Sequence, residues 1–277
     1  MSGYPMTGVM GVLNVTPDSF SDGGRFVDTT AAVEHGRRLW QDGADIVDVG
    51  GESTRPGADP VATAIEAERV LPVVAELAAA GVPVSVDTTK AEVAASALDA
   101  GAVVVNDVSA GEVDPEMFEV VATRDAGMVL MHRRGDPTTM QDDPRYDDVV
   151  SEVADALVDR RAAAIAAGVG EHAILVDPGI GFGKTPQHNL TLLAHLDELV
   201  ERVAAPVLIG TSRKSFIGQT LALPVDARDE ATLATVVWAM EHGASMVRVH
   251  DAAAARRAID LLAALGVCRP ESMTGAA

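Results

Sequence analysis

Short runs of apolar residues recur along the chain and alternate with longer amphipathic segments. Each short run is almost continuously hydrophobic, which is typical of a strand covered on both faces of a parallel sheet. The runs predict eight strands, at about residues 7–13, 45–49, 83–87, 103–106, 128–131, 173–177, 206–210 and 245–249. The Ala-rich segments between them predict helices at 29–42, 62–80, 90–100, 114–126, 147–168, 229–242 and 252–265, and a shorter one near 189–202.

A glycine stands between most of the predicted helices and the strand that follows. Glycine is common just after a helix because it accepts the left-handed backbone conformation that ends one. The glycines in this position are Gly43, Gly81, Gly101, Gly127, Gly168 and Gly243. The repeated order of strand, helix and glycine predicts eight βα units. Eight units without an evident linker favour one (β/α)8 TIM barrel domain over residues 1–277, rather than a doubly wound sheet.

Most of the apolar runs end on a polar residue. All strands of a (β/α)8 barrel run parallel, so their C-terminal ends open onto one face and their last side chains share one pocket. The residues at or just after these ends are Asn14, Asp48, Asp87, Asn106, His132, Asp177, Gly210 with Lys214, and Arg248 with His250. The pattern therefore predicts an enzyme with its site at the barrel mouth.

The net charge of the chain limits the kinds of partner that we expect it to bind. Lys and Arg number 21 against 41 Asp and Glu, which gives a formal net charge of −20. Such a field repels phosphates, so we expect neither nucleic acid nor an anionic membrane as a partner. The acidic residues are dispersed, and the only lysines are Lys90, Lys184 and Lys214. We expect an acidic, halophile-like surface suited to a salt-rich cytosol, whereas a GC-rich genome would explain the few lysines but not the charge.

Cysteine usage and hydropathy indicate where the protein works. Cys268 is the only cysteine, so an internal disulfide is impossible and a reducing cytosol fits. No apolar run approaches the roughly 18 residues of a membrane span. The first residues show no basic stretch before an apolar run, so we expect no signal peptide. These features predict a cytoplasmic protein.

Three polar side chains at strand ends predict a binding site for a flat ligand. Asp87, Asn106 and Asp177 close the third, fourth and sixth strands. Carboxylates and an amide that converge on one cavity can accept hydrogen bonds from an amino-amidine edge, which pterin and guanine carry. The alternative is that each caps a following helix, and Asp87 before Thr88 and Thr89 is placed to do so.

Cationic side chains near the ends of the last two strands predict an anion site. Lys214 could donate to ring carbonyl or nitrogen atoms, or it could be a solvated surface charge. Arg248 and His250 are two residues apart, so both can face one phosphate-like group. The alternative is an Arg–Asp pair beside a satisfied histidine.

Two further segments hold weaker signals. The amide of Asn14 is a suitable hard ligand for Mg²⁺, although an Asn at a strand end is more often a turn residue. The segment 179–185 resembles a phosphate-binding loop, but Pro178 stands where that pattern requires glycine. Phe182 within it could pack against a planar ligand or in the core.

Long sequence motifs resemble the dihydropteroate synthase family. The resemblance runs from the first strand to the eighth, over nearly the whole chain. It is carried by Leu13–Gly24 (LNVTPDSFSDGG), Asp45–Gly57 (DIVDVGGESTRPG), Ser85–Thr88, Asn106–Ser109, Met131–His132 through Met140–Gln141, Asp177–Phe182, Gly210–Ser215 and Arg248–Asp251.

The resemblance implies a (β/α)8 transferase of folate biosynthesis. Such an enzyme joins 4-aminobenzoate to 6-hydroxymethyl-7,8-dihydropterin diphosphate and releases diphosphate. By this resemblance the pterin lies among Asp87, Asn106, Asp177, Lys214, Val108, Met131, Phe182 and Gly210. The diphosphate lies at Arg248, His250 and Asn14 with Mg²⁺, and the aminobenzoate is bordered by Phe20, Asp22, Thr54, Arg55, Pro56 and Ser215. The residues assigned to catalysis are Asp22, Asp87, Asp177, Lys214, Arg248 and His250.

Two other functions remain open at the level of sequence. A methyltetrahydrofolate methyltransferase-like barrel would share Asp87, Asn106 and Asp177 but has no use for a diphosphate site. A catalytically silent paralogue would bind pterin without turnover. The resemblance also implies a homodimer.

Overall fold

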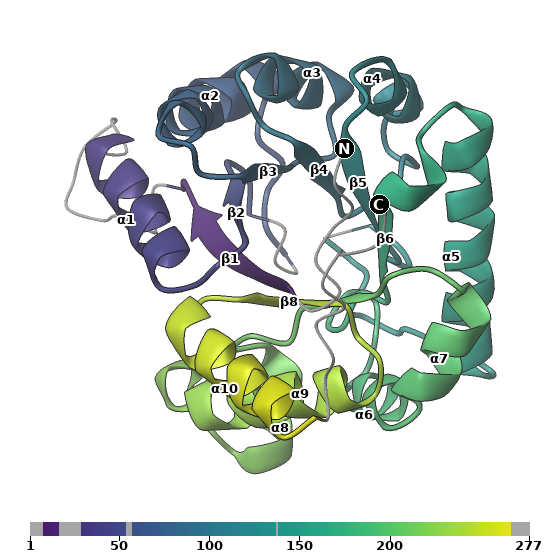
Figure 1. Cartoon of the computed structure of the whole chain (residues 1–277). Coiled ribbons are helices and arrows are strands. Elements are labelled where there is room, and N and C mark those ends of the chain that lie inside the picture. Colours follow the sequence, from purple (N-terminus) through teal and green to yellow (C-terminus); the bar gives the residue numbers. More distant parts are fainter. Residues whose placement is uncertain (1–7, 17–28, 54–56, 137, 267–277) are drawn as a thin grey trace, which may run out of the picture.

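The chain forms a barrel of eight parallel strands surrounded by helices (Figure 1). The computed structural model describes residues 8–16, 29–53, 57–136 and 138–266. The strands run in the order β6-β5-β4-β3-β2-β1-β8-β7, and a parallel bridge between Val176 and Val207 joins the two edges. Their bounds are β1 Gly8–Asn14, β2 Ile46–Gly50, β3 Val84–Asp87, β4 Val104–Asp107, β5 Gly127–Met131, β6 Ile174–Asp177, β7 Leu208–Ile209 and β8 Met246–Val249.

The helices cover the outer face of the barrel (Figure 1). They are α1 Thr29–Gln41, α2 Thr63–Ala79, α3 Ala91–Asp99, α4 Met117–Thr123, α5 Val149–Ala166, α6 Pro186–Ala194, α7 Leu196–Val203, α8 Ser215–Leu221, α9 Asp229–Glu241 and α10 Ala252–Ala264. Within the described parts of the chain, none is long and apolar enough to cross a membrane.

The predicted barrel is confirmed, with three local corrections. The helix expected near 189–202 is two helices, because the backbone leaves the helical conformation at His195 (φ −114°, ψ 34°). The short helix α8 was not predicted. Gly127 does not end a helix: it begins β5, and the left-handed conformation before it belongs to Asp125 (φ 50°).

The apolar core has two parts. A large cluster fills the layer between the strands and the helices. A smaller one fills the inside of the barrel and consists of Met10, Ile46, Val104, Val129, Leu175, Leu208 and Met246. Side chains two residues apart on a strand face the same way, so the next inward position of each strand lies nearer the mouth. The inner cluster therefore lies directly below the side chains of the mouth and closes the bottom of the site.

Candidate active site

The polar residues of the mouth follow the inner apolar cluster at a spacing of two. Asp48 follows Ile46, Asn106 follows Val104, Asp177 follows Leu175 and Arg248 follows Met246. The same spacing brings Met131 after Val129 and Gly210 after Leu208. The strand period thus brings four of the eight predicted pterin residues, Asn106, Met131, Asp177 and Gly210, to one end of the barrel.

Arg248 joins three strands through two carboxylates. Its Nε donates to Oδ2 of Asp48 over 2.7 Å, and its Nη2 donates to Oδ2 of Asp87 over 2.8 Å. Asn106 Nδ2 also donates to Oδ2 of Asp48, over 2.9 Å. Oδ1 of Asp48 and Oδ1 of Asp87 are buried and accept no hydrogen bond from the part of the chain that the structure describes. Asp48 is 0% exposed and Asp87 is 4% exposed, so Oδ1 of Asp87 is the better candidate acceptor for a donor-rich ligand edge.

The contacts of Asp87 and Arg248 distinguish between the alternative interpretations of these two residues. Asp87 does not cap α3, whose N-terminal flanking residue is Lys90 without a side-chain cap. Arg248 does form Arg–Asp pairs, but across the barrel rather than with Asp251. The side chain of Asp251 instead accepts from the backbone N–H of Ala254 and caps α10.

Burial shifts the pKa values of three ionisable groups at the mouth, namely Asp87, Asp177 and Lys214. Burial raises the pKa of Asp87 to about 7, although the charge of Arg248 opposes the shift, and Asp48 reinforces it. Burial likewise raises the pKa of Asp177 against the opposing charge of Lys214. Burial lowers the pKa of Lys214 to about 8, with Asp177 opposing. Groups that titrate near neutral pH in a cleft are typical of functional sites.

Lys214 and Phe182 lie together beside Asp177. The Lys214 Nζ is 4.8 Å from the centre of the Phe182 ring and donates to the carbonyl oxygen of Ile180. Oδ1 of Asp177 accepts from the backbone N–H of Gly179 over 2.7 Å. A Cβ on Gly210 would lie 3.7 Å from Lys214 Nζ and 3.9 Å from Asp177 Oδ2. Lys214 is thus a component of the mouth rather than a solvated surface charge.

The remaining predicted residues occupy different positions. His250 lies just beyond β8, with its Nδ1 2.8 Å from Ser212 Oγ. Val108 and Met131 are buried, Asn14 is half-buried, and Ser215 is exposed at the start of α8. Phe20, Asp22, Thr54, Arg55 and Pro56 lie outside the described residues.

Two features of the site were missed. Asp48 was recognised as a strand end but given no role, although it holds both Asn106 and Arg248. Its spacing of two from Ile46 could have indicated this. Lys90 also bridges Glu52, at the start of the second loop, and the buried Glu66 of α2. No local pattern in the sequence indicates that bridge, because Glu52, Glu66 and Lys90 lie far apart along the chain.

Comparisons with known proteins agree with this geometry. A family model described as "Pterin binding enzyme" matches residues 10–250. The chain is 49% identical to a dihydropteroate synthase of Mycobacterium leprae over 265 residues, which covers 93% of this chain and 92% of that one. It resembles a solved structure of Xanthomonas albilineans dihydropteroate synthase with 4-aminobenzoic acid, at 46% identity and a TM-score of 0.87, covering 94% and 93% of the two chains.

A second structure of the Xanthomonas albilineans enzyme, in complex with 7,8-dihydropteroate, is 43% identical, with a TM-score of 0.84 and 94% of each chain covered. These alignments cover 93–94% of this chain and so include the whole barrel. The chain therefore belongs to the dihydropteroate synthases of the pterin-binding enzyme family.

Proposed function

We propose that this chain condenses 6-hydroxymethyl-7,8-dihydropterin diphosphate with 4-aminobenzoate to give 7,8-dihydropteroate and diphosphate. The observation that carries the proposal is the convergence of Asp87, Asn106, Asp177 and Lys214 at one barrel mouth, above the inner apolar cluster. The two solved structures of the Xanthomonas albilineans enzyme are with 4-aminobenzoic acid and in complex with 7,8-dihydropteroate, which are the proposed substrate and product.

The proposed pterin slot matches the donors and acceptors of the ring. The buried Oδ1 of Asp87, which has no donor among the described residues, can accept from the amino-amidine edge when the carboxylate is ionised. Lys214 supplies N–H donors for the ring carbonyl or nitrogen atoms. Phe182 and Met131 supply apolar contact for the ring faces. A site with buried acceptors of this kind discriminates against ligands that lack the matching donors.

The chemistry requires stabilised charges rather than a strong base. The bond between the pterin methylene carbon and the diphosphate oxygen breaks, and its electron pair leaves with the oxygen. The electron-rich ring and the carboxylates of Asp87 and Asp177 stabilise the cation that remains on the methylene. The amino nitrogen of 4-aminobenzoate attacks this carbon and then loses a proton. Arg248 and His250 are the residues assigned to the departing diphosphate.

The donor set at the mouth fits a magnesium ion that is held mainly by its substrate. The described residues hold no group of three His, Cys, Asp or Glu side chains that could bind a metal by themselves. Mg²⁺ usually binds through one or two protein oxygens, waters and substrate phosphates, and the half-buried amide of Asn14 at the end of β1 can be one such ligand. When bound, the ion would neutralise charge on the leaving diphosphate.

Four further properties remain predictions. One pterin-binding domain over residues 1–277 follows from the repeated strand–helix pattern. A homodimer follows from the family resemblance, and a cytoplasmic location follows from the single cysteine. The halophile-like surface follows from the net charge of −20.

Turnover tests the proposal directly. The full chain is incubated with the pterin diphosphate, 4-aminobenzoate and Mg²⁺, and 7,8-dihydropteroate is quantified. We expect product only when all three are present. Binding of the pterin diphosphate without product would identify a silent paralogue, and methyl transfer from methyltetrahydrofolate would identify the methyltransferase-like alternative.

A further inference from the structure

Lys184 is a buried lysine to which the proposed chemistry gives no role. It ends the loop that runs from β6 to α6 and is only 2% exposed. Its Nζ lies 2.9 Å from Nδ1 of His132 and 3.1 Å from the carbonyl oxygen of Phe182, with the His132 carbonyl oxygen at 3.5 Å. None of these acceptors is a carboxylate. A buried amine in such surroundings is costly, so its presence calls for a physical reason.

The loop that carries Lys184 is pressed against the chain that follows β5. The N–H of His132 donates to the carbonyl oxygen of Asp177 over 2.9 Å. A Cβ on Gly179 would lie 1.9 Å from the His132 carbonyl oxygen, and a Cβ on Gly183 would lie 2.2 Å from the Arg134 carbonyl oxygen. Only glycine allows so close a backbone approach at these two positions.

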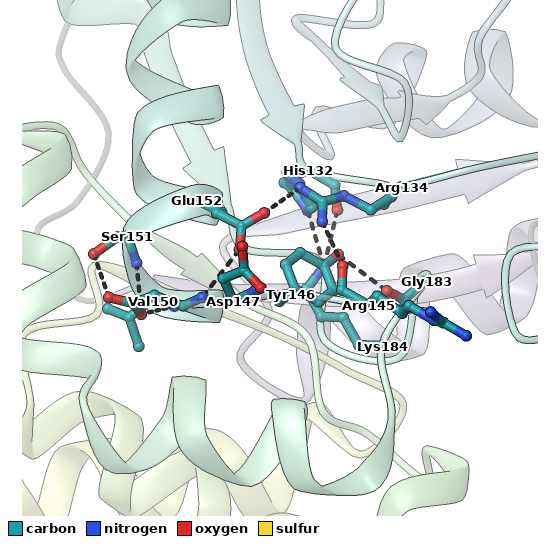
Figure 2. Close-up of polar contacts among 11 residues, drawn as sticks. His132, Arg134, Arg145, Tyr146, Asp147, Val150, Ser151, Glu152, Gly183 and Lys184 are labelled. Carbon is teal, nitrogen blue, oxygen red and sulfur yellow. Dashed lines mark hydrogen bonds and ion pairs between the residues drawn. The ribbon is translucent and has the colours of Figure 1, made fainter. Parts of the chain in front are cut away.

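Side chains of the segment after β5 hold the same loop from outside. The Tyr146 hydroxyl donates to the Gly183 carbonyl oxygen over 3.0 Å, and Gln141 Nε2 donates to the Gly181 carbonyl oxygen over 2.6 Å. The Arg134 guanidinium lies 4.0 Å from the centre of the Tyr146 ring and donates to Glu152 over 2.8 Å. Figure 2 shows Arg134, Tyr146, Glu152 and Gly183 near His132 and Lys184.

On its opposite side, the same loop contacts Lys214 of the proposed pterin slot. The Ile180 carbonyl oxygen accepts from Lys214, and the Phe182 ring lies 4.8 Å from the same Nζ. A Cβ on Gly181 would lie 3.3 Å from Lys214 Cδ. Any shift of the loop would therefore move two contacts of Lys214 together.

The protonation of the pair is compatible with this arrangement. Burial, reinforced by the charges of Lys184 and Arg134, lowers the pKa of His132 to about 2, so its ring is neutral and can accept at Nδ1. Burial also lowers the pKa of Lys184 well below its ordinary value, with Asp177 opposing the shift and Lys214 and Arg134 adding to it. The Nζ keeps at least two N–H bonds in either state, so the contact with the Phe182 carbonyl oxygen does not depend on its charge.

We propose that Lys184 is a positioning residue for the pterin slot. It fixes the backbone at Phe182 against His132, so that the Phe182 ring and the Ile180 carbonyl group hold Lys214 at the mouth. The inference rests on the proposed function in one respect, namely that the slot takes a pterin.

The test compares Lys184→Met with the unmodified full chain. Methionine keeps most of the volume and removes the donors. We expect the Kd for the pterin diphosphate to rise about tenfold, which is the size of effect expected for the loss of one hydrogen bond, while the KM for 4-aminobenzoate changes by less than about twofold. Arg161→Met, on the outer face where Arg161 pairs with Glu171, is the control and should leave both constants unchanged. An unchanged pterin Kd, or an equal rise in both constants, would overturn the proposal.

Variants of His132 test whether Lys184 acts through that residue. His132→Leu removes the acceptor, whereas the side-chain oxygen of His132→Asn can replace Nδ1. We expect His132→Leu to weaken pterin binding, His132→Asn to restore most of it, and His132→Leu combined with Lys184→Met to be no weaker than Lys184→Met alone. Effects that multiply in the double variant would refute a shared mechanism.

The binding comparison can be interpreted even if one variant does not fold or the unmodified chain forms no product. If Lys184→Met does not fold, the contrast between His132→Leu and His132→Asn decides the question alone. Product formation by the unmodified chain is measured separately, so pterin binding without product would overturn the proposed reaction and leave the binding comparison valid.

Discussion

Nη2 of Arg248 on β8 donates to Oδ2 of Asp87 on β3 over 2.8 Å, although 161 residues separate the two in sequence. The same guanidinium also binds Asp48 on β2. Burial lowers the pKa of Arg248, but the charges of Asp48, Asp87 and Asp177 and the hydrogen bond to Asp48 together outweigh burial and raise it. The residue assigned to the diphosphate is therefore also the counter-ion of a carboxylate assigned to the pterin.

Replacement of Arg248 should affect stability as well as chemistry. Arg248→Met leaves Asp48 and Asp87 buried without their cation, and breaking a buried pair in this way costs about 3–5 kcal/mol. We expect the free energy of unfolding to fall by that order in urea titrations, and pterin binding to weaken together with turnover. Arg124→Ala, which removes the exposed pair with Asp99, is the control and should leave stability nearly unchanged. Undiminished pterin binding by folded Arg248→Met would show that the two roles are separate.

Pterin binding should depend on the ionisation of Asp87. Its pKa of about 7 means that the carboxylate is protonated below neutral pH and loses acceptor capacity. We expect the affinity for 6-hydroxymethylpterin, which lacks the titrating diphosphate, to decrease as the pH falls through about 7. Calorimetric titrations between pH 5.5 and pH 8 (about one unit or more on either side of that pKa) can measure this. Asp87→Asn should bind weakly at every pH, and a wild-type affinity constant over the whole range would exclude the assigned role.

The ionisation of Asp87 should also affect stability, but in the opposite direction: stability should decrease as the pH rises. The pKa of Asp87 is raised above its ordinary value of 3.8, so the folded state holds this proton more tightly than the unfolded state. Its contribution to stability is complete below about pH 4 and is lost as the pH rises to about 7. We expect the free energy of unfolding, relative to Asp87→Asn, to fall across that window. A difference that rises with pH would contradict the raised pKa.

Lys90 should be important for stability although it lies away from the pterin slot. Its ammonium bridges Glu52 and the fully buried Glu66. Burial lowers its pKa, but the hydrogen bonds that it donates to Glu52 and Glu66 outweigh burial and raise it. Lys90→Met should therefore lower the free energy of unfolding by about 3–5 kcal/mol, since a buried carboxylate loses its partner. Lys90→Met combined with Glu66→Gln should recover part of the loss, and an additive loss would show that the bridge contributes little.

Salt should stabilise the protein. With a net charge of −20, repulsion between acidic groups destabilises the compact state in dilute buffer. The Debye length shortens from about 10 Å at 0.1 M salt to about 3 Å at 1 M, so molar KCl screens most of this repulsion. We expect the Tm to rise with KCl and turnover to follow. A Tm that is already maximal in dilute buffer would count against the halophile-like interpretation.

The sequence by itself determined the architecture and much of the site. Near-continuous apolar runs fixed the eight strands, because a strand covered on both faces must be hydrophobic throughout. The polar residues that end them, Asp87, Asn106 and Asp177 among them, were predicted to converge because parallel strands bring their C-terminal ends to one face.

Only the tertiary structure decided which of these residues contact one another. The pairs of Arg248 with Asp48 and Asp87 depend on barrel closure, which brings β8 across from β2 and β3. The contact between Lys184 and His132 depends on the packing of two loops, because these residues are 52 positions apart in the sequence. Local patterns encode the period and the ends of each element, because these follow from neighbours in the chain. Burial and ion pairing depend on groups far apart in sequence, so the pKa values and partners of the mouth appear only when the barrel has closed.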